Sequence, residues 1–133
     1  MSMKVVIADP DWRFAAQATG YLESHAHHVV NQPRRQDAVA CIRHWQPDLV
    51  ILSAELAEDG AMFREIRSLP SCPAILLTEH VDRYDRAWRA WQQGGDELLM
   101  KPVFKAEELR NAIVAAMENA TAGTIARPRA ASA

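Results

Sequence analysis

The sequence predicts one α/β domain: a doubly wound parallel sheet of five strands with helices on both faces. Four short runs rich in Val, Ile and Leu are bounded by turn residues, which is typical of strands covered on both faces. A weaker fifth run follows, and segments with apolar residues at helical spacing separate the runs. This alternation predicts right-handed crossovers between parallel strands, and 133 residues fit a single domain.

The expected elements can be given in chain order. Strands are expected at 5–8, 28–30, 49–52, 74–77 and 98–100, and helices at 10–24, 35–45, 60–69, 81–93 and from about residue 105. Asp9 is expected to cap the first helix, with Pro10 at its first position. Pro47 and the pair Gly94-Gly95 mark the ends of the second and fourth helices.

Composition limits the classes of function. A formal net charge of -2 gives no attraction to nucleic acid or membranes, and no apolar run is long enough to span a bilayer. Cys41 and Cys72 are far apart in the sequence and predict reduced thiols. The chain enters a strand at once with no signal-peptide pattern, so we expect a cytoplasmic protein. Residues 3–119 are expected to form the domain and 120–133 a flexible tail or truncated linker.

Polar side chains follow four of the predicted strands. Ligands of open parallel sheets bind outside the carboxyl ends of the strands, so these positions define the candidate site. They are Asp9, Pro10 and Asp11 after the first strand, Ser53 after the third, Thr78 after the fourth and Lys101 after the fifth.

These positions resemble the response-regulator receiver domain of two-component signalling over residues 3–119. The resemblance depends on ADPD after the first strand, PDLVIL, AILLT and, most specifically, GGDELLMKP through the fifth strand. It implies the flavodoxin-like (CheY-like) strand order 2-1-3-4-5 and a cis Lys101-Pro102 peptide. It also implies that Asp9 matches the first of two Mg²⁺-binding acids, Thr78 the switch hydroxyl and Lys101 the phosphate-binding lysine.

Two departures from the family pattern affect the chemistry. Pro10 stands where the family has its second acid, and Ser53 stands at the phosphoacceptor position. Phosphoryl transfer needs an activated nucleophile and a divalent cation, so ordinary aspartyl phosphorylation is expected to fail. Mg²⁺ binding is expected to be weak or absent, with only Asp9 and Asp11 as candidate ligands. Glu79 is expected to add a negative charge beside any incoming phosphate.

Without phosphate, Lys101 needs another counter-charge. We expect an ion pair with Asp9, together with hydrogen bonds from Ser53 and Thr78, because a lysine buried alone costs several kcal/mol or loses its proton. Such a pair would hold the site in one state.

The leading interpretation is an atypical receiver, or pseudo-receiver, that acts by binding proteins and is not an enzyme. The resemblance implies a face formed by the fourth helix, fifth strand and fifth helix, with Trp91, Leu98 and Asn111 as candidates. Leu98 replaces the family's aromatic switch residue. A protein partner, a fused output domain or a second copy would bind there. Trp88 and Trp91 share the inward stripe of the fourth helix, so core packing is the first expectation for both.

Two alternatives remain from the residues. One is a divergent receiver that is phosphorylated on Ser53 or on a nearby acid such as Glu55. The other is a flavodoxin-like FMN carrier, which needs a loop of hydroxyl and amide donors after the first strand. Residues 9–12, Asp-Pro-Asp-Trp, are acidic and bulky instead, so no cofactor is expected.

Overall fold

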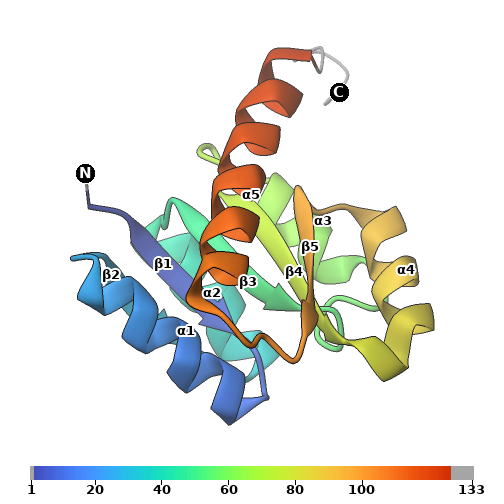
Figure 1. Ribbon diagram of the computed structural model, residues 1–133. Helices are drawn as coiled ribbons and strands as arrows, with labels where there is room; N and C mark the ends of the chain where they lie inside the picture. The colour runs from blue at the N-terminus through green and yellow to red at the C-terminus, as the bar shows by residue number, and fades with distance from the viewer. Residues whose placement is uncertain (1, 127–133) are drawn as a thin grey trace.

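The computed structural model describes residues 2–126, and the elements alternate as expected (Figure 1). The strands are β1 (Lys4–Ala8), β2 (His28–Asn31), β3 (Leu49–Ser53), β4 (Ala74–His80) and β5 (Glu97–Lys101). The helices are α1 (Trp12–Ser24), α2 (Arg35–Trp45), α3 (Ala61–Arg67), the short 3-10 helix η1 (Val81–Arg83), α4 (Tyr84–Gln93) and α5 (Ala106–Ala126).

The five strands form one parallel sheet in the order β2-β1-β3-β4-β5, which confirms the predicted fold class. β1 lies between β2 and β3 because the chain reverses its direction of winding after the second strand. The carboxyl ends of the inner strands are aligned, with Ala8 opposite Leu52 and Ser53 opposite Thr78. No helix within residues 2–126 has both the length and the apolar composition that crossing a bilayer requires.

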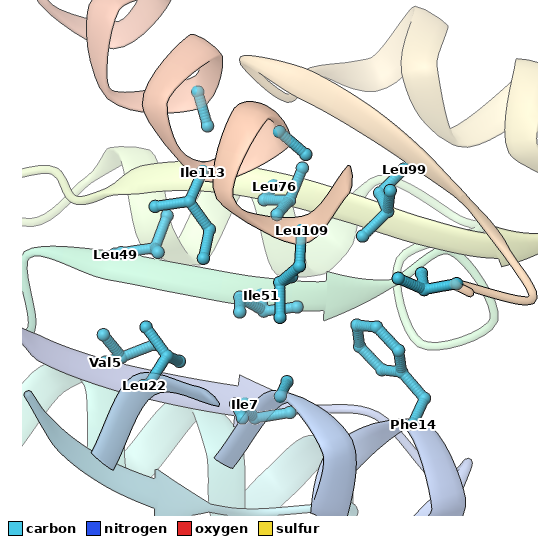
Figure 2. Packing of buried hydrophobic residues seen from close by; sticks show 14 of the residues in the cluster. Val5, Ile7, Phe14, Leu22, Leu49, Ile51, Leu76, Leu99, Leu109 and Ile113 are labelled. Carbon is cyan, nitrogen blue, oxygen red and sulfur yellow. The ribbon is translucent and has the colours of Figure 1, made fainter. Parts of the chain in front are cut away.

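Each face of the sheet packs against its own layer of helices. α1 and α5 cover one face, where residues such as Ile7, Phe14, Ile51 and Leu109 form a core (Figure 2). α2, α3 and α4 cover the other face through a second core that includes Phe63. Side chains alternate along a strand, so successive residues of β1, β3 and β4 enter opposite cores. This explains why those strands are continuous apolar runs.

The start of α1 differs from the prediction. The N-cap is Asp11, whose Oδ1 accepts a hydrogen bond from the Phe14 N–H at 3.2 Å, and the helix begins at Trp12. Pro10 therefore precedes the helix. Asp9 does not cap it, because its Oδ1 accepts from the Asp11 N–H at 2.9 Å and its other oxygen points into the candidate site.

The inward face of α4 also differs from the prediction. Ala87 and Ala90 are its buried residues, whereas Trp88 is 49% exposed, so the expectation of core packing is wrong for Trp88. Trp91 is half-buried and packs partly against the second core, as expected. The two alanines lie against β4 and turn Trp88 away from the sheet, because neighbouring positions on a helix differ by about 100°.

The last helix continues past the predicted domain end. α5 runs to Ala126, so residues 120–126 are helical rather than an irregular tail. Met117 and Ala120 still pack partly against the first core, and the end of the helix projects beyond the sheet in Figure 1. The remainder of the predicted tail, 127–133, lies outside the described residues.

Candidate functional site

Strand alternation brings the predicted site residues to one face of the sheet. Asp9, Ser53 and Thr78 continue the positions that enter the core beneath α1 and α5, and Lys101 does the same on β5. All four are buried. The four residues come from segments up to 92 positions apart, and the parallel topology gathers them at the carboxyl rim.

A buried ion pair occupies the centre of the site. The Lys101 ammonium lies 2.9 Å from Asp9 Oδ2, and the two side chains are 3% and 1% exposed. The Thr78 hydroxyl donates to the same oxygen at 2.7 Å. The ammonium also lies 5.0 Å from the centre of the Phe14 ring, which adds a favourable cation–π contact. The predicted Lys101–Asp9 pair and its hydrogen bond from Thr78 are confirmed. The expected cis Lys101-Pro102 peptide is also present.

Ser53 lies opposite Thr78 at the ends of β3 and β4, but it forms its hydrogen bond with a residue outside the Lys101–Asp9 pair. Its Oγ accepts a hydrogen bond from the backbone N–H of Glu55 at 3.2 Å, and the residue is 3% exposed. The expected hydrogen bond between Ser53 and the Lys101–Asp9 pair is absent among the hydrogen bonds of residues 2–126. The reason is local: the tight turn after β3 directs the Glu55 N–H back to the serine oxygen.

Asp11 forms the outer part of the site. Its Oδ2 lies 3.4 Å from the Lys101 ammonium and 3.1 Å from His80 Nε2. Burial disfavours its charge, but the Phe14 N–H and the Lys101 ammonium outweigh burial and hold the pKa of Asp11 below its usual range. Lys101 thus faces two carboxylates.

The carboxylate oxygens of the site have partners within the protein. Both oxygens of Asp9 and both oxygens of Asp11 already accept hydrogen bonds or ion pairs from the protein. The Lys101 ammonium lies within 3.4 Å of both carboxylates. Pro10 offers no side-chain ligand, and within residues 2–126 no group of three His, Cys, Asp or Glu side chains is arranged to hold a metal.

Glu79 has a role that the sequence reasoning missed. It follows Thr78 on β4 and therefore enters the opposite core, beneath α4. There its carboxylate pairs with the Nε of Arg86, accepts from Arg86 Nη2 at 3.2 Å and accepts from the His80 N–H at 2.9 Å. Glu79 therefore does not add an unpaired charge to the phosphate position. The period-two alternation of β4, applied to Thr78 and Glu79, would have revealed this.

The Glu79–Arg86 pair is held in its ionised form. Burial disfavours the Glu79 charge, but the Arg86 hydrogen bonds, the His80 N–H and the Arg86 and Lys101 charges hold the pKa of Glu79 below its usual range. The hydrogen bonds that Arg86 donates to Glu79 in turn raise the pKa of Arg86. This pair is the main polar attachment of α4 to the sheet, because the rest of its buried face consists of Ala87 and Ala90.

The predicted partner residues lie near the β5 edge of the sheet. Trp91 on α4 and Leu98 on β5 are both half-buried and pack partly against the second core. Asn111 is exposed on α5. Asn119, about two turns later, donates to the Asp96 carbonyl at 2.8 Å, so this part of α5 borders the start of β5.

Comparison with known proteins identifies the family. Residues 5–114 match the response regulator receiver domain family. No curated protein matches the chain significantly. NtrX from Brucella abortus superposes with a TM-score of 0.79 at 22% identity, over 93% of this chain and 28% of that one. This chain therefore spans less than a third of NtrX.

Two shorter structures match over most of their own length. A response regulator receiver domain protein from Clostridium thermocellum matches at 21% identity and a TM-score of 0.72, over 89% of this chain and 96% of that one. A two-component response regulator from Clostridium difficile matches at 24% identity and a TM-score of 0.71, over 86% and 95%. At identities below 25%, the solved structures show only that the fold is shared. The match to the family covers residues 5–114, which is most of the chain, and therefore shows membership of the family. The chain belongs to the response regulator receiver domain family of two-component signalling.

Proposed function

We propose that this receiver domain signals by protein–protein interaction and does not accept a phosphoryl group. The observation that carries the proposal is the Lys101–Asp9 ion pair at 2.9 Å. The lysine that would meet a phosphate is already neutralised, and the acid that would help to hold Mg²⁺ supplies the neutralising charge. A phosphoryl group would have to break this pair without a bound cation to offset the loss.

The position of Ser53 supports the same conclusion. Ser53 is 3% exposed, and its hydroxyl accepts a hydrogen bond from the Glu55 N–H. No carboxylate accepts the Ser53 hydroxyl proton among the hydrogen bonds of residues 2–126. A serine hydroxyl attacks phosphorus only when a base removes its proton. Asp9 follows β1, the strand beside β3, and both of its oxygens are occupied. The serine therefore lacks the activation that phosphoryl transfer requires.

The interaction face in this proposal is formed by α4, β5 and α5. Trp91 and Leu98 offer half-buried apolar surface and Asn111 an exposed amide. Aromatic side chains beside apolar residues are enriched at protein interfaces. A partner protein, a fused output domain or a second copy would bind this face, and Leu98→Lys would weaken that binding. Val39→Lys serves as the control, because Val39 on α2 is also half-buried and packs partly against the second core but lies outside α4, β5 and α5.

The proposal is tested by phosphorylation of the full chain. The protein is incubated with acetyl phosphate and Mg²⁺, and its intact mass is measured. We expect no phosphoryl adduct, and no change in tryptophan fluorescence with beryllofluoride and Mg²⁺. A phosphoryl adduct that Ser53→Ala or Glu55→Gln abolishes would instead establish the divergent, phosphorylatable receiver.

Two variants test the reason for the inactivity. Ser53→Asp alone is expected to remain inert, because Pro10 still provides no ligand and Lys101 still pairs with Asp9. Ser53→Asp combined with Pro10→Asp supplies both missing carboxylates and is expected to bind Mg²⁺ more tightly than either single variant. Equal Mg²⁺ affinity in the single Ser53→Asp variant would show that the missing second acid is not the obstacle.

A further inference from the structure

The turn between α1 and β2 carries three of the five histidines of the chain, His25, His27 and His28. His25 and His28 are exposed, whereas His27 is half-buried and its ring contacts the backbone just before β1. Histidine is the side chain whose charge changes between about pH 5 and pH 8. The hydrogen bonds of each ring therefore determine how this turn responds to acid.

The ring of His27 accepts a hydrogen bond from the backbone. Its Nδ1 lies 3.0 Å from the backbone nitrogen of Met3, and a backbone N–H can only donate. Nδ1 of His27 must therefore carry no proton, which assigns the proton of the neutral ring to Nε2. A protonated imidazole donates from both nitrogens, so the cation would bring two N–H groups face to face. This hydrogen bond exists only while His27 is neutral.

His25, two residues earlier, has the opposite arrangement. Its Nδ1 lies 2.9 Å from the Tyr21 carbonyl oxygen, which can only accept. Nδ1 of His25 therefore carries a proton in both the neutral and the charged ring, and a second proton at Nε2 leaves the hydrogen bond intact. The Tyr21 ring lies against His25 with the ring centres 4.5 Å apart, a contact that also favours a positive charge. Of these two rings, only His27 loses a hydrogen bond when it is protonated.

The surroundings of His27 also oppose its protonation. Burial, together with the positive charges of His25, His28 and the amino terminus of the chain, lowers the pKa of His27 from its usual value of 6.5. Among residues 2–126 the only histidine in an ion pair is His80, so no ion pair offsets these charges. The unfolded chain therefore takes up this proton first. The stability that neutral His27 supplies is fully present above about pH 6.5 and is lost as the pH falls toward the folded pKa.

The contact with His27 holds the segment before β1 on the α1–β2 turn. The Met3 carbonyl accepts from the His28 N–H at 2.9 Å, and the Ser2 hydroxyl donates to the Ala26 carbonyl at 2.9 Å. β2 is a four-residue edge strand whose only neighbour in the sheet is β1. Release of Met3 would remove the first hydrogen bond of the β1–β2 ladder, at a strand with no second neighbour to hold it.

We propose that His27 is a pH-sensitive latch that holds residues 2 and 3 on the α1–β2 turn at neutral pH and releases them on acidification. The latch opens because the protonated ring can no longer accept from the Met3 N–H, and the other hydrogen bonds between this segment and the turn are weakened with it. His27 lies at the amino ends of β1 and β2, whereas the phosphate-type pocket lies at the carboxyl rim. The proposal therefore does not depend on the proposed function.

Nuclear magnetic resonance of the full 133-residue chain between about pH 8 and pH 5 tests the proposal. The imidazole nitrogen shifts at the upper end are expected to show the proton on Nε2 for His27 and on Nδ1 for His25. His27 is expected to titrate below about pH 6.5. The exchange protection of the Met3 amide, corrected for intrinsic exchange, is expected to fall by about fivefold as His27 titrates, as for the loss of one hydrogen bond.

His27→Asn is the matched control, because its Oδ1 can replace Nδ1 as the acceptor but does not take up a proton. This variant should keep the Met3 protection at the acidic end, whereas His27→Phe should lack it at every pH. His25→Asn should keep the pH dependence of the parent. Protection that stays constant while His27 titrates, titration of His27 at or above about pH 6.5, or the same acid-induced loss in His27→Asn would each overturn the proposal.

Discussion

Removal of the Arg86 guanidinium tests whether the buried pair on the far face of the sheet holds α4 in place. Arg86→Met leaves the Glu79 carboxylate, 2% exposed, with the His80 N–H as its remaining donor. Removing one partner of a buried ion pair costs about 3–5 kcal/mol. We expect about 3 kcal/mol here, because that backbone hydrogen bond remains and the Arg86 side chain is itself 15% exposed. This is a large fraction of the roughly 5–15 kcal/mol that stabilises a domain.

The free energy of unfolding is measured by urea denaturation, followed by tryptophan fluorescence and circular dichroism. Arg89→Met is the matched control, because Arg89 lies on the same helix, is 49% exposed and pairs with Glu58. It should change stability by less than about 1 kcal/mol. The double variant Arg86→Met with Glu79→Met replaces both charges by apolar groups and should recover at least half of the loss.

The pH dependence gives an independent check. In the parent, the folded pKa of Glu79 is lowered, so this group stabilises the fold above its unfolded pKa of about 4.3, and that contribution is lost as the pH falls through the folded pKa. In Arg86→Met, burial raises the folded pKa, and the destabilisation should shrink between pH 7 and pH 5. A loss below about 1 kcal/mol at pH 7, or a double variant no more stable than Arg86→Met, would refute the reasoning.

Three further substitutions have expected outcomes in the same urea assay. Lys101→Met leaves its carboxylate partner on β1 buried and should lose about 3 kcal/mol, part of which returns when Asp9→Asn removes the charge. Asp11→Asn keeps the helix cap but loses the charge facing Lys101. Because the folded pKa of Asp11 is lowered, its stabilisation is fully present above the unfolded pKa of about 3.9, and the difference from the parent should shrink as the pH falls through the folded pKa. Gly95→Ala, at φ +102° with the new Cβ 2.9 Å from a β4 leucine, should lose about 1–3 kcal/mol, whereas Gly20→Ala in open space on α1 should be neutral or stabilising.

The sequence was sufficient to predict the fold and the centre of the site because both depend on strong local patterns. Continuous apolar strands alternating with amphipathic helices admit few arrangements, and the rim residues follow once the strand ends are located. A buried Lys101 needs a counter-charge, and Asp9 was the acid that the topology placed within reach. These predictions required only the positions at which the strands end and the signs of the charges that follow them.

The errors arose where the direction of a side chain mattered. Whether Glu79 faces the phosphate position or the opposite core depends on a single step along β4, and its partner Arg86 is seven residues away, beyond a turn. The helix begins at Trp12 and not at Pro10, because Asp11, two residues after the predicted cap Asp9, accepts the hydrogen bond from the Phe14 N–H. Trp88 was misplaced since two alanines, which give a weak apolar signal, define the inner face of α4.

The Lys101–Asp9 pair also constrains which strands can be neighbours during folding. Residues 5–8 of β1, 49–52 of β3 and 74–77 of β4 are short runs of apolar residues only, so hydrophobicity alone would tolerate exchanged or shifted pairings among them. The pair connects the edge strand β5 to β1 across two intervening strands. An arrangement of strands that separated Lys101 from Asp9 would leave an unpaired charge in the apolar core, at a cost of several kcal/mol. The buried pair would thus favour the native strand order over other orders.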